Sequence, residues 1–336
     1  MNDASRLVRL LVEPSSAGAL SRSDWTELLS IAHAERLIGT LADRLASLPL
    51  PTPIMDALAE ARVQADFGRI QALWEVEMAR RALAPHGIPL ILLKGSAFAH
   101  AGLPAGDGRL IGDLDILVGR DRIDAAETAV LAAGWEWLKD DPYTHAYYRR
   151  WMHELPPLVH KDRGAMIDVH HTILPLTARR TPDADALIAD SVEIAPDVRM
   201  LSPADVIVHA ATHLLADGDL AGGLRNLWDI DRLLRHFTID PAFWPALSMR
   251  ARRHEMRGPV ALALRLSRRL YETPVDPTAA GRDKASDALF IRRLLARDGW
   301  GRETRPLIRF GFYIRSHWMR MPPLMLARHL WIKARG

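Results

Sequence analysis

The sequence predicts an α+β fold, in which a small β-sheet in the middle of the chain is flanked by helices. Short apolar runs separated by turn residues occupy residues 87–200, a pattern typical of strands. Segments with the apolar spacing of helices precede this region in residues 1–86 and follow it in residues 201–336. We therefore expect an N-terminal helical segment, a central core that contains the sheet, and a larger C-terminal helical domain.

The amino-acid composition limits the classes of protein and of active site that this sequence can form. The 336 residues are 49% hydrophobic and 25% charged, which is ordinary for a soluble globular protein. The absence of cysteine excludes disulfides, thiol nucleophiles and cysteine-bound zinc, and it agrees with the cytoplasm, where we expect the protein to reside. Arg and Glu interrupt the apolar residues near the N-terminus, so we expect neither a signal peptide nor a membrane anchor there.

Two helices are expected before the sheet. Ser23 or Asp24 is placed to cap a first helix that runs to about Leu45, where a proline-rich stretch ends it. Thr52 then caps a long helix that ends near residue 86.

The long helix carries one apolar stripe. Its residues recur at spacings of four, three and four: Val63, Phe67, Ile70 and Trp74. Because residues at this spacing lie on one helical face, the pattern predicts a helix that packs this stripe against the core.

The central region predicts alternating strands and helices. Strands are expected at Leu90–Leu93, Leu114–Val118, Trp135–Leu138, Tyr147–His153, Leu155–His160 and Ala165–His171. Helices are expected from Ser96 to about Ala101 and at Asp121–Ala133. A loop rich in Gly and Pro joins the first helix to the second strand.

From residue 202 onward the sequence predicts helices. Ser202 is a natural N-cap, with Pro203 at the first helical position. The expected helices lie near Ala204–Ala216, Leu224–His236, Pro241–Arg253, Pro259–Tyr271, Ala285–Ala296 and Pro306–Arg320.

Two carboxylates in the second strand are the strongest chemical signal. Asp113 and Asp115 are two positions apart, so in a strand they project from the same face. Two acids on one face of a buried strand repel each other and are costly to desolvate. A divalent cation removes this cost, and hard oxygen ligands suit Mg²⁺.

These residues resemble a known superfamily. The pair Gly95-Ser96, followed by Asp113-Leu114-Asp115 with apolar neighbours, is similar to the signature of the nucleotidyltransferases related to polymerase β. The motif LLKG, followed by R-x-I-G-D-L-D-I-L-V, most resembles a poorly characterised bacterial group of these nucleotidyltransferases. The gap from Ser96 to Asp113 is longer here than in the minimal members.

The resemblance implies a fold, a reaction and a metal. Residues 87–200 would be the catalytic core, built on a mixed sheet, and Asp168 would be the third carboxylate. Two Mg²⁺ ions, or Mn²⁺ in their place, would be held by Asp113, Asp115 and Asp168. The reaction would transfer a nucleoside monophosphate from an NTP, with ATP as the expected donor, to an acceptor hydroxyl and release pyrophosphate. Asp168 would also accept the proton of that hydroxyl, directly or through a water.

Four residues are candidates for binding the donor nucleotide. Ser96, with Gly95 beside it, would meet the terminal phosphates, and an N-cap role for Ser96 is compatible with this. Lys94 would neutralise phosphate charge, unless strand alternation points its side chain away. Arg109 is either a bidentate phosphate donor or a solvated loop residue.

Three histidines are candidates for the acceptor pocket. His209 and His213 are four apart and so lie on one helical face, but HAATH lacks the Glu of the zinc-protease motif HExxH. His170 lies on the same strand face as Asp168 and would contact either the metal site or the acceptor. Packed core histidines are the alternative interpretation of His209 and His213.

The sequence does not determine the identity of the acceptor. The C-terminal segment, residues 302–336, carries seven Arg and one Lys against a single acid, Glu303, and mixes them with aromatic residues. It is either an RNA-binding stretch, a membrane-surface contact, or an amphipathic helix packed on its own domain. We expect a small-molecule acceptor. The alternatives are a macromolecule (an RNA 3′ end or a protein side chain) and a non-catalytic nucleotide-binding scaffold.

Overall fold

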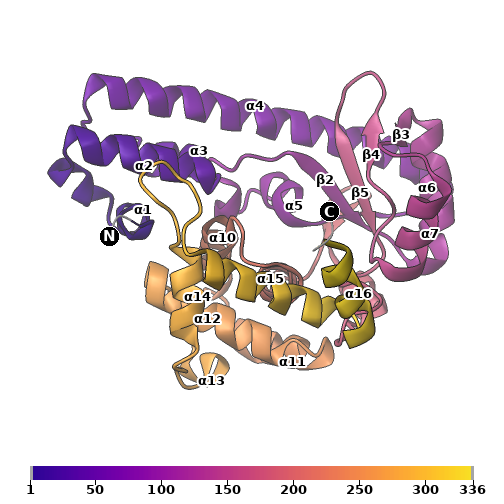
Figure 1. Cartoon of the computed structure of the whole chain (residues 1–336). Helices are drawn as coiled ribbons and strands as arrows, with labels where there is room; N and C mark the ends of the chain where they lie inside the picture. The colour runs from indigo at the N-terminus through magenta and orange to yellow at the C-terminus, as the bar shows by residue number, and fades with distance from the viewer. Residues whose placement is uncertain (1–2, 334–336) are drawn as a thin grey trace.

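The computed structural model describes residues 3–333 and confirms the α+β class. A seven-stranded sheet has the order β3-β4-β5-β2-β1-β7-β6, and helices pack around it (Figure 1). The sheet is mixed, because β1 pairs with β7 and β2 with β5 in parallel, whereas the other neighbours are antiparallel.

The strands are short, and those at the centre are the most buried. They span β1 Leu90–Leu92, β2 Asp113–Leu117, β3 Trp135–Trp137, β4 Leu158–His160, β5 Met166–His170, β6 Val192–Ala195 and β7 Val198–Met200. All three residues of β1 are buried, as are the last four of β2. A strand covered on both faces reads as a continuous apolar run, which is why the sequence predicts β1 and β2 so closely.

Four helices precede the sheet: α1 Ser5–Val12, α2 Arg22–Ala34, α3 Ile38–Arg44 and α4 Thr52–Leu83. The expected single helix up to Leu45 is wrong, because the chain breaks between α2 and α3, where Arg36 adopts a left-handed φ of 54°. The cap of α2 is Ser21, which forms a capping box with Asp24. The long helix α4 is confirmed, although Thr52 is its first residue and not its cap.

The prediction for the packed face of α4 is wrong. The expected stripe points to solvent, with exposed fractions of 67% for Val63, 65% for Phe67 and 65% for Ile70. The buried face is instead made mainly of alanines and a few larger apolar residues, namely Leu58, Ala61, Ala65, Ala72, Val76, Ala79 and Leu83. Small side chains let this helix lie close to its neighbours, as a Cβ added at Gly39 of α3 would lie 3.0 Å from the Ala65 Cβ.

The helices of the central region are α5 Lys94–His100, α6 Ile123–Ala132, α7 Pro142–Trp151 and α8 Ala184–Ala189. The strand expected at Tyr147–His153 is wrong, because most of this stretch belongs to α7. Asp141 caps this helix by accepting a hydrogen bond from the backbone N–H of Thr144, and Pro142 occupies the first turn. The strand expected at Leu155–His160 begins later, at Leu158, after two prolines that cannot donate to the sheet.

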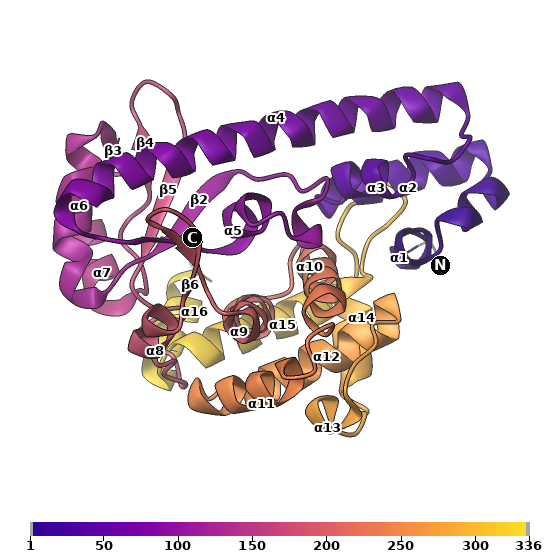
Figure 2. The same cartoon turned by 180° about the vertical axis from the view of Figure 1, so that it is seen from behind.

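The C-terminal region is helical, as predicted. Its helices are α9 Pro203–Thr212, α10 Gly223–Phe237, α11 Phe243–Arg253, α12 Arg257–Tyr271, α13 Pro277–Ala280, α14 Asp287–Leu294, α15 Pro306–Arg320 and α16 Pro323–Lys333. The helix expected up to Ala216 changes to a π-helical turn at His213–Asp217. In both views α5 lies between the long helix α4 and the helices α9 and α10 (Figures 1 and 2).

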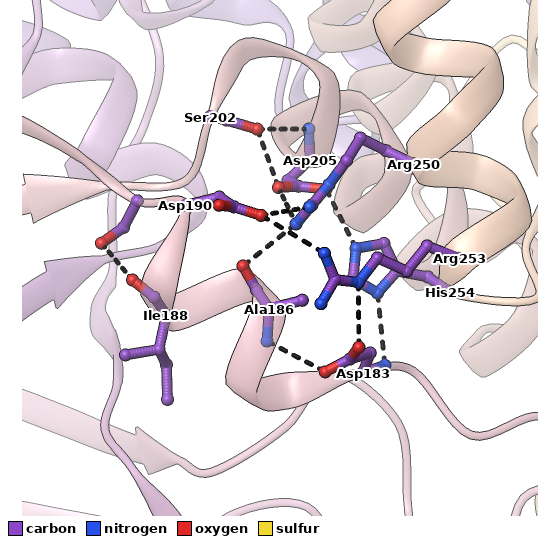
Figure 3. A network of polar contacts seen from close by, with 10 residues as sticks. Asp183, Ala186, Ile188, Asp190, Ser202, Asp205, Arg250, Arg253 and His254 are labelled. Carbon is purple, nitrogen blue, oxygen red and sulfur yellow. Dashed lines mark hydrogen bonds and ion pairs between the residues drawn. The ribbon is translucent and has the colours of Figure 1, made fainter.

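A buried polar network ties α8 to the C-terminal helices (Figure 3). Ser202 caps α9, as predicted, by accepting from the backbone N–H of Asp205. The Asp205 carboxylate accepts hydrogen bonds from Arg250 Nε at 2.7 Å and from His254 Nε2 at 3.1 Å. Arg250 also pairs with Asp190, just after α8. Burial raises the pKa of Asp205, but hydrogen bonds from His254, Arg250 and Ser202 outweigh it and lower that pKa overall.

No helix among residues 3–333 is both long and apolar enough to cross a membrane. The division of the chain at residues 86 and 200 stays a prediction.

Candidate active site

Three carboxylates meet at the centre of the sheet. Asp113 and Asp115 lie on β2, which pairs in parallel with β5 so that Asp115 faces Asp168 directly and Asp113 faces Met166. One oxygen from each of Asp113, Asp115 and Asp168 lies within 4.8 Å of the other two. The strand pairing therefore joins the predicted third acid to the first two.

The cluster is electrostatically strained. Burial, followed by the charge of Asp115, raises the pKa of Asp168 to about 6. The same two causes raise the pKa of Asp113, which lies at the exposed end of β2. Asp168 Oδ1 is buried and has no hydrogen-bond partner among the described residues.

These observations fit a divalent cation. An unpartnered buried carboxylate oxygen and mutual repulsion between acids both cost free energy, and a cation between the carboxylates relieves both costs. The donor set is all carboxylate oxygen, which suits Mg²⁺ or Mn²⁺. Asp113, Asp115 and Asp168 are the residues that would hold it.

Asp115 is held in place by two cationic or potentially cationic side chains. Lys94 Nζ lies 2.6 Å from Asp115 Oδ1, and His170 Nε2 lies 3.0 Å from the same oxygen. Burial alone would raise the pKa of Asp115, but Lys94 and His170 outweigh it and hold that pKa below its usual value. Of the two orientations expected for Lys94, the structure therefore has the one toward the carboxylates.

Gly95 and Arg109 fit together. A Cβ added at Gly95 would lie 2.6 Å from Arg109 Nε, so only glycine lets the guanidinium lie against this turn. Arg109 is not a solvated loop residue, because it pairs with Asp229 on α10 and lies 5.7 Å from the centre of the Phe98 ring. Its Nε has no hydrogen-bond partner among the described residues.

Ser96 lies deeper than expected. It is 1% exposed, and its hydroxyl donates to the backbone carbonyl of Asp113 at 3.3 Å. The helix that it was expected to cap begins two residues earlier, at Lys94, with Leu93 at the N-cap position. In this structure Ser96 therefore holds α5 against β2, and its proposed contact with phosphate stays a prediction.

Two of the three carboxylates line a cleft of about 500 Å³. Asp113 and Asp115 line it together with five cationic side chains: Arg36, Lys94, Arg109, Arg225 and Arg297. The volume falls within the range of about 300–1,000 Å³ that is typical of small-molecule sites. The sequence offered no local signal for Arg36 or Arg297, which tertiary packing brings in from the α2–α3 break and from the turn after α14.

Arg225 and Arg297 already have acidic partners, whereas Arg36 does not. Arg225 Nε donates to Asp229 at 3.0 Å, and Arg297 Nε donates to Glu35 at 2.7 Å. Arg36 is exposed and makes no ion pair within residues 3–333. It is the cation of this cleft that is most available to an anionic ligand.

The three candidate histidines surround this region. His209 and His213 line a smaller cavity of about 40 Å³ together with Lys94, Phe98 and Arg109, and His213 also lines the large cleft. Burial, then the charge of Lys94, lowers the pKa of His209 well below its ordinary value. His170 contacts Asp115 as described above, and the assignment of all three to an acceptor pocket stays a prediction.

Part of the basic C-terminal segment packs against the rest of the chain, both on the helical region and on residues 177–179. Arg315 donates to the Leu215 carbonyl at 2.8 Å, and its guanidinium lies 5.1 Å from the centre of the Phe290 ring. Phe310 and Trp318 of the same helix remain exposed. Residues 334–336 lie outside the described part of the chain.

The sequence of this chain matches one known protein family. A model of the family described as "Uncharacterised nucleotidyltransferase" matches residues 21–272, most of the chain. The chain belongs to this nucleotidyltransferase family. The matched residues run from the start of α2 to the end of α12, so they contain the three carboxylates and every cleft cation named above except Arg297. No curated protein matches the chain.

Proposed function

We propose that this nucleotidyltransferase is metal-dependent and transfers the nucleoside monophosphate of an NTP, with ATP as the donor, to a hydroxyl group of a small-molecule acceptor. Pyrophosphate is the second product. The observation that carries the proposal is the carboxylate cluster, two members of which line a cleft together with five cations.

The donor side of the cleft matches a triphosphate in charge. Lys94 and Arg109 lie beside the carboxylates, and Arg36 has no acidic partner within the described residues. Guanidinium groups bind phosphate oxygens through paired N–H donors, and Lys acts as a point charge. We assign the triphosphate to these three side chains and to the turn at Gly95.

Asp113, Asp115 and Asp168 would hold the metal ions. Bound there, the ions would supply the electrostatic part of the chemistry, by neutralising charge on the transferred phosphoryl group and lowering the pKa of the attacking hydroxyl. The protein's own contribution is to fix three carboxylates on two paired strands and to restrain Asp115 through Lys94 and His170.

The cavity beside Lys94 adds an apolar wall to the site, made by Leu92, Phe98, Val206 and His209. Its volume of about 40 Å³ is too small for a whole acceptor, so we place the acceptor in the large cleft, with an apolar group against this wall. The packing of Arg315 against Phe290 and Phe312 makes the C-terminal segment a less available surface for RNA. For these reasons we favour a small acceptor over a macromolecule.

The test follows the label of an NTP marked at its α-phosphate. Wild type with Mg²⁺ and a panel of hydroxyl compounds is expected to release unlabelled pyrophosphate and to leave the label on one acceptor. Asp113→Asn is the matched control, because it removes one carboxylate at an exposed position, and it should lose this activity. Release of inorganic phosphate with a labelled nucleoside diphosphate would show cleavage of the wrong bond and would overturn the proposal.

A further inference from the structure

A second cluster of ligating side chains lies on the other side of His170. One ligand atom from each of His153, Glu154 and His170 lies within 4.8 Å of the other two. His153 and His170 are 8% and 3% exposed, and the side chain of Glu154 is 18% exposed. This set contains two imidazoles, which distinguishes it chemically from the all-carboxylate cluster.

Backbone pairing holds the cluster in place. The segment after α7 runs antiparallel to the end of β5, with Glu154 and His170 as bridge partners. Leu155 N donates to the Val169 carbonyl at 2.9 Å, and His171 N donates to the His153 carbonyl at 2.9 Å. The three side chains therefore come from β5 and from a segment hydrogen-bonded to it, rather than from a free loop.

The distances inside the cluster are those between ligands of one metal ion. Glu154 Oε2 lies 3.3 Å from His170 Nδ1 and 3.6 Å from His153 Nε2. Ligands at about 2.1 Å from a tetrahedral zinc ion are separated by roughly 3.4 Å. The two distances from Glu154 match this spacing, and the third pair, His153 and His170, lies within 4.8 Å.

His153 lacks the partners that a buried imidazole normally has. Its Nδ1 is buried without a hydrogen-bond partner among the described residues, and its Nε2 is too far from Glu154 for a hydrogen bond. Its Nε2 lies 3.6 Å from Glu154 Oε2, so a ring nitrogen and a carboxylate oxygen face each other at the spacing of two metal ligands.

His170 has the arrangement of a metal-bound histidine. Its Nδ1 faces Glu154, while its Nε2 lies 3.0 Å from Asp115 Oδ1. Metal-ligating histidines commonly donate their second ring N–H to a carboxylate, which fixes the tautomer and the ring orientation. Asp115 fills that position here.

We propose that His153, Glu154 and His170 form a second metal site, selective for a transition-metal ion such as Zn²⁺ over Mg²⁺. Imidazole nitrogen favours zinc, cobalt or nickel, whereas magnesium prefers oxygen. Three protein ligands leave a fourth position open to water or another molecule. Through His170, an ion in this site would also fix the Asp115 carboxylate. The proposal does not depend on nucleotidyl transfer.

The test is the binding of Zn²⁺ and Co²⁺ by full-length protein that has been stripped with a chelator. Calorimetry is expected to give one tight Zn²⁺ site in wild type, and Co²⁺ should give the intense visible absorption of a tetrahedral site. His153→Gln should weaken Zn²⁺ binding at least tenfold. His171→Gln is the matched control, because it changes the neighbouring buried histidine outside the cluster and should bind as wild type does.

Two further variants keep the result interpretable. Asp113→Asn should retain Zn²⁺ binding, which separates this site from the carboxylate cluster. Glu154→Gln repeats the ligand test should His153→Gln fail to fold, and circular dichroism without metal establishes which variants are folded. Folded wild type that binds neither ion, or unchanged binding when a cluster ligand is replaced in a folded variant, would overturn the proposal.

Discussion

Asp115 and Asp168 face each other directly across the parallel strands β2 and β5. They are two buried or half-buried acids on adjacent strands, and only Asp115 is paired with a cation, because Lys94 and His170 both contact its Oδ1. Asp168 is left with an unpartnered oxygen and a pKa raised to about 6. We therefore expect the carboxylate of Asp168, which the proposed metal site needs, to lower the stability of the metal-free protein.

Replacing Asp168 should stabilise the metal-free protein. An acid with a higher pKa in the folded state than in the unfolded state costs stability as the pH rises from its unfolded value of 3.8 through about 6. Asp168→Asn removes this cost, so its free energy of unfolding should exceed that of wild type by about 1–3 kcal/mol at pH 7 and by little at pH 4. Urea unfolding in a chelator at both pH values measures the difference.

With Mg²⁺ present, wild type should become more stable than Asp168→Asn. Added Mg²⁺ binds the carboxylates of wild type and raises its free energy of unfolding, while Asp168→Asn gains less. A wild type that is more stable than Asp168→Asn at pH 7 in the chelator would contradict the account of repulsion in this cluster.

Asp113 and Asp115 should differ in their effect on stability. Asp115→Asn leaves Lys94 and His170 without their shared carboxylate and should cost about 3 kcal/mol, as expected when one partner of a buried pair is removed. Asp113 has no such pair, so Asp113→Asn should unfold at the same urea concentration as wild type or a higher one. Equal midpoints for both variants would show that the contacts of Asp115 contribute nothing to the fold.

The fit of Arg109 against Gly95 predicts a sharp steric effect. Gly95→Ala places a methyl group 2.6 Å from Arg109 Nε and should displace the guanidinium, with a loss of NTP affinity of at least tenfold. Gly112→Ala is the matched control in the same cleft, because a Cβ there meets nothing within 4 Å. Equal NTP affinities of the two variants, measured by calorimetry, would remove Arg109 from the donor site.

The exposed stripe of α4 makes a separate prediction. Phe67→Gln should change the free energy of unfolding by no more than about 0.5 kcal/mol, because this side chain is 65% exposed. Val76→Ala on the buried face should cost about 2 kcal/mol. Denaturant titration of both variants distinguishes the two faces, and a larger loss for Phe67→Gln would restore the face expected from the sequence.

The errors over α4 and α7 have identifiable physical causes. The sequence predicts the helical period of α4 correctly, but it favours the large apolar residues as the buried face. Alanines form most of that face instead, because small side chains let α4 lie closer to its neighbours. In α7 the aromatic residues around Tyr147 suggested a strand, although Asp141 and Pro142 already carried the start signal of a helix. In α4, tertiary packing decides which face is buried. In α7, the helix-capping residues outweigh the strand preference of the aromatic residues.

Some residues of the candidate site can be predicted from the sequence alone, whereas others depend on tertiary structure. The i,i+2 spacing of Asp113 and Asp115 places them on one face of any strand, so the sequence is sufficient for that pair. The pairing of Asp115 with Asp168 depends on strand register, and the approach of Arg36 and Arg297 depends on segments far apart in the chain. Tertiary proximity of this kind leaves no local pattern, so the sequence predicts Lys94 and Arg109 beside the carboxylates but not Arg36 or Arg297.

The most direct test of the central proposal is calorimetric titration of the four NTPs into wild type and Asp113→Asn, each with Mg²⁺ and with a chelator. We expect one NTP to bind wild type only when Mg²⁺ is present, and we expect the folded variant to lose that binding. Binding of the same strength in the chelator, or no binding of any NTP by folded wild type with Mg²⁺, would contradict a metal-dependent donor site at these carboxylates.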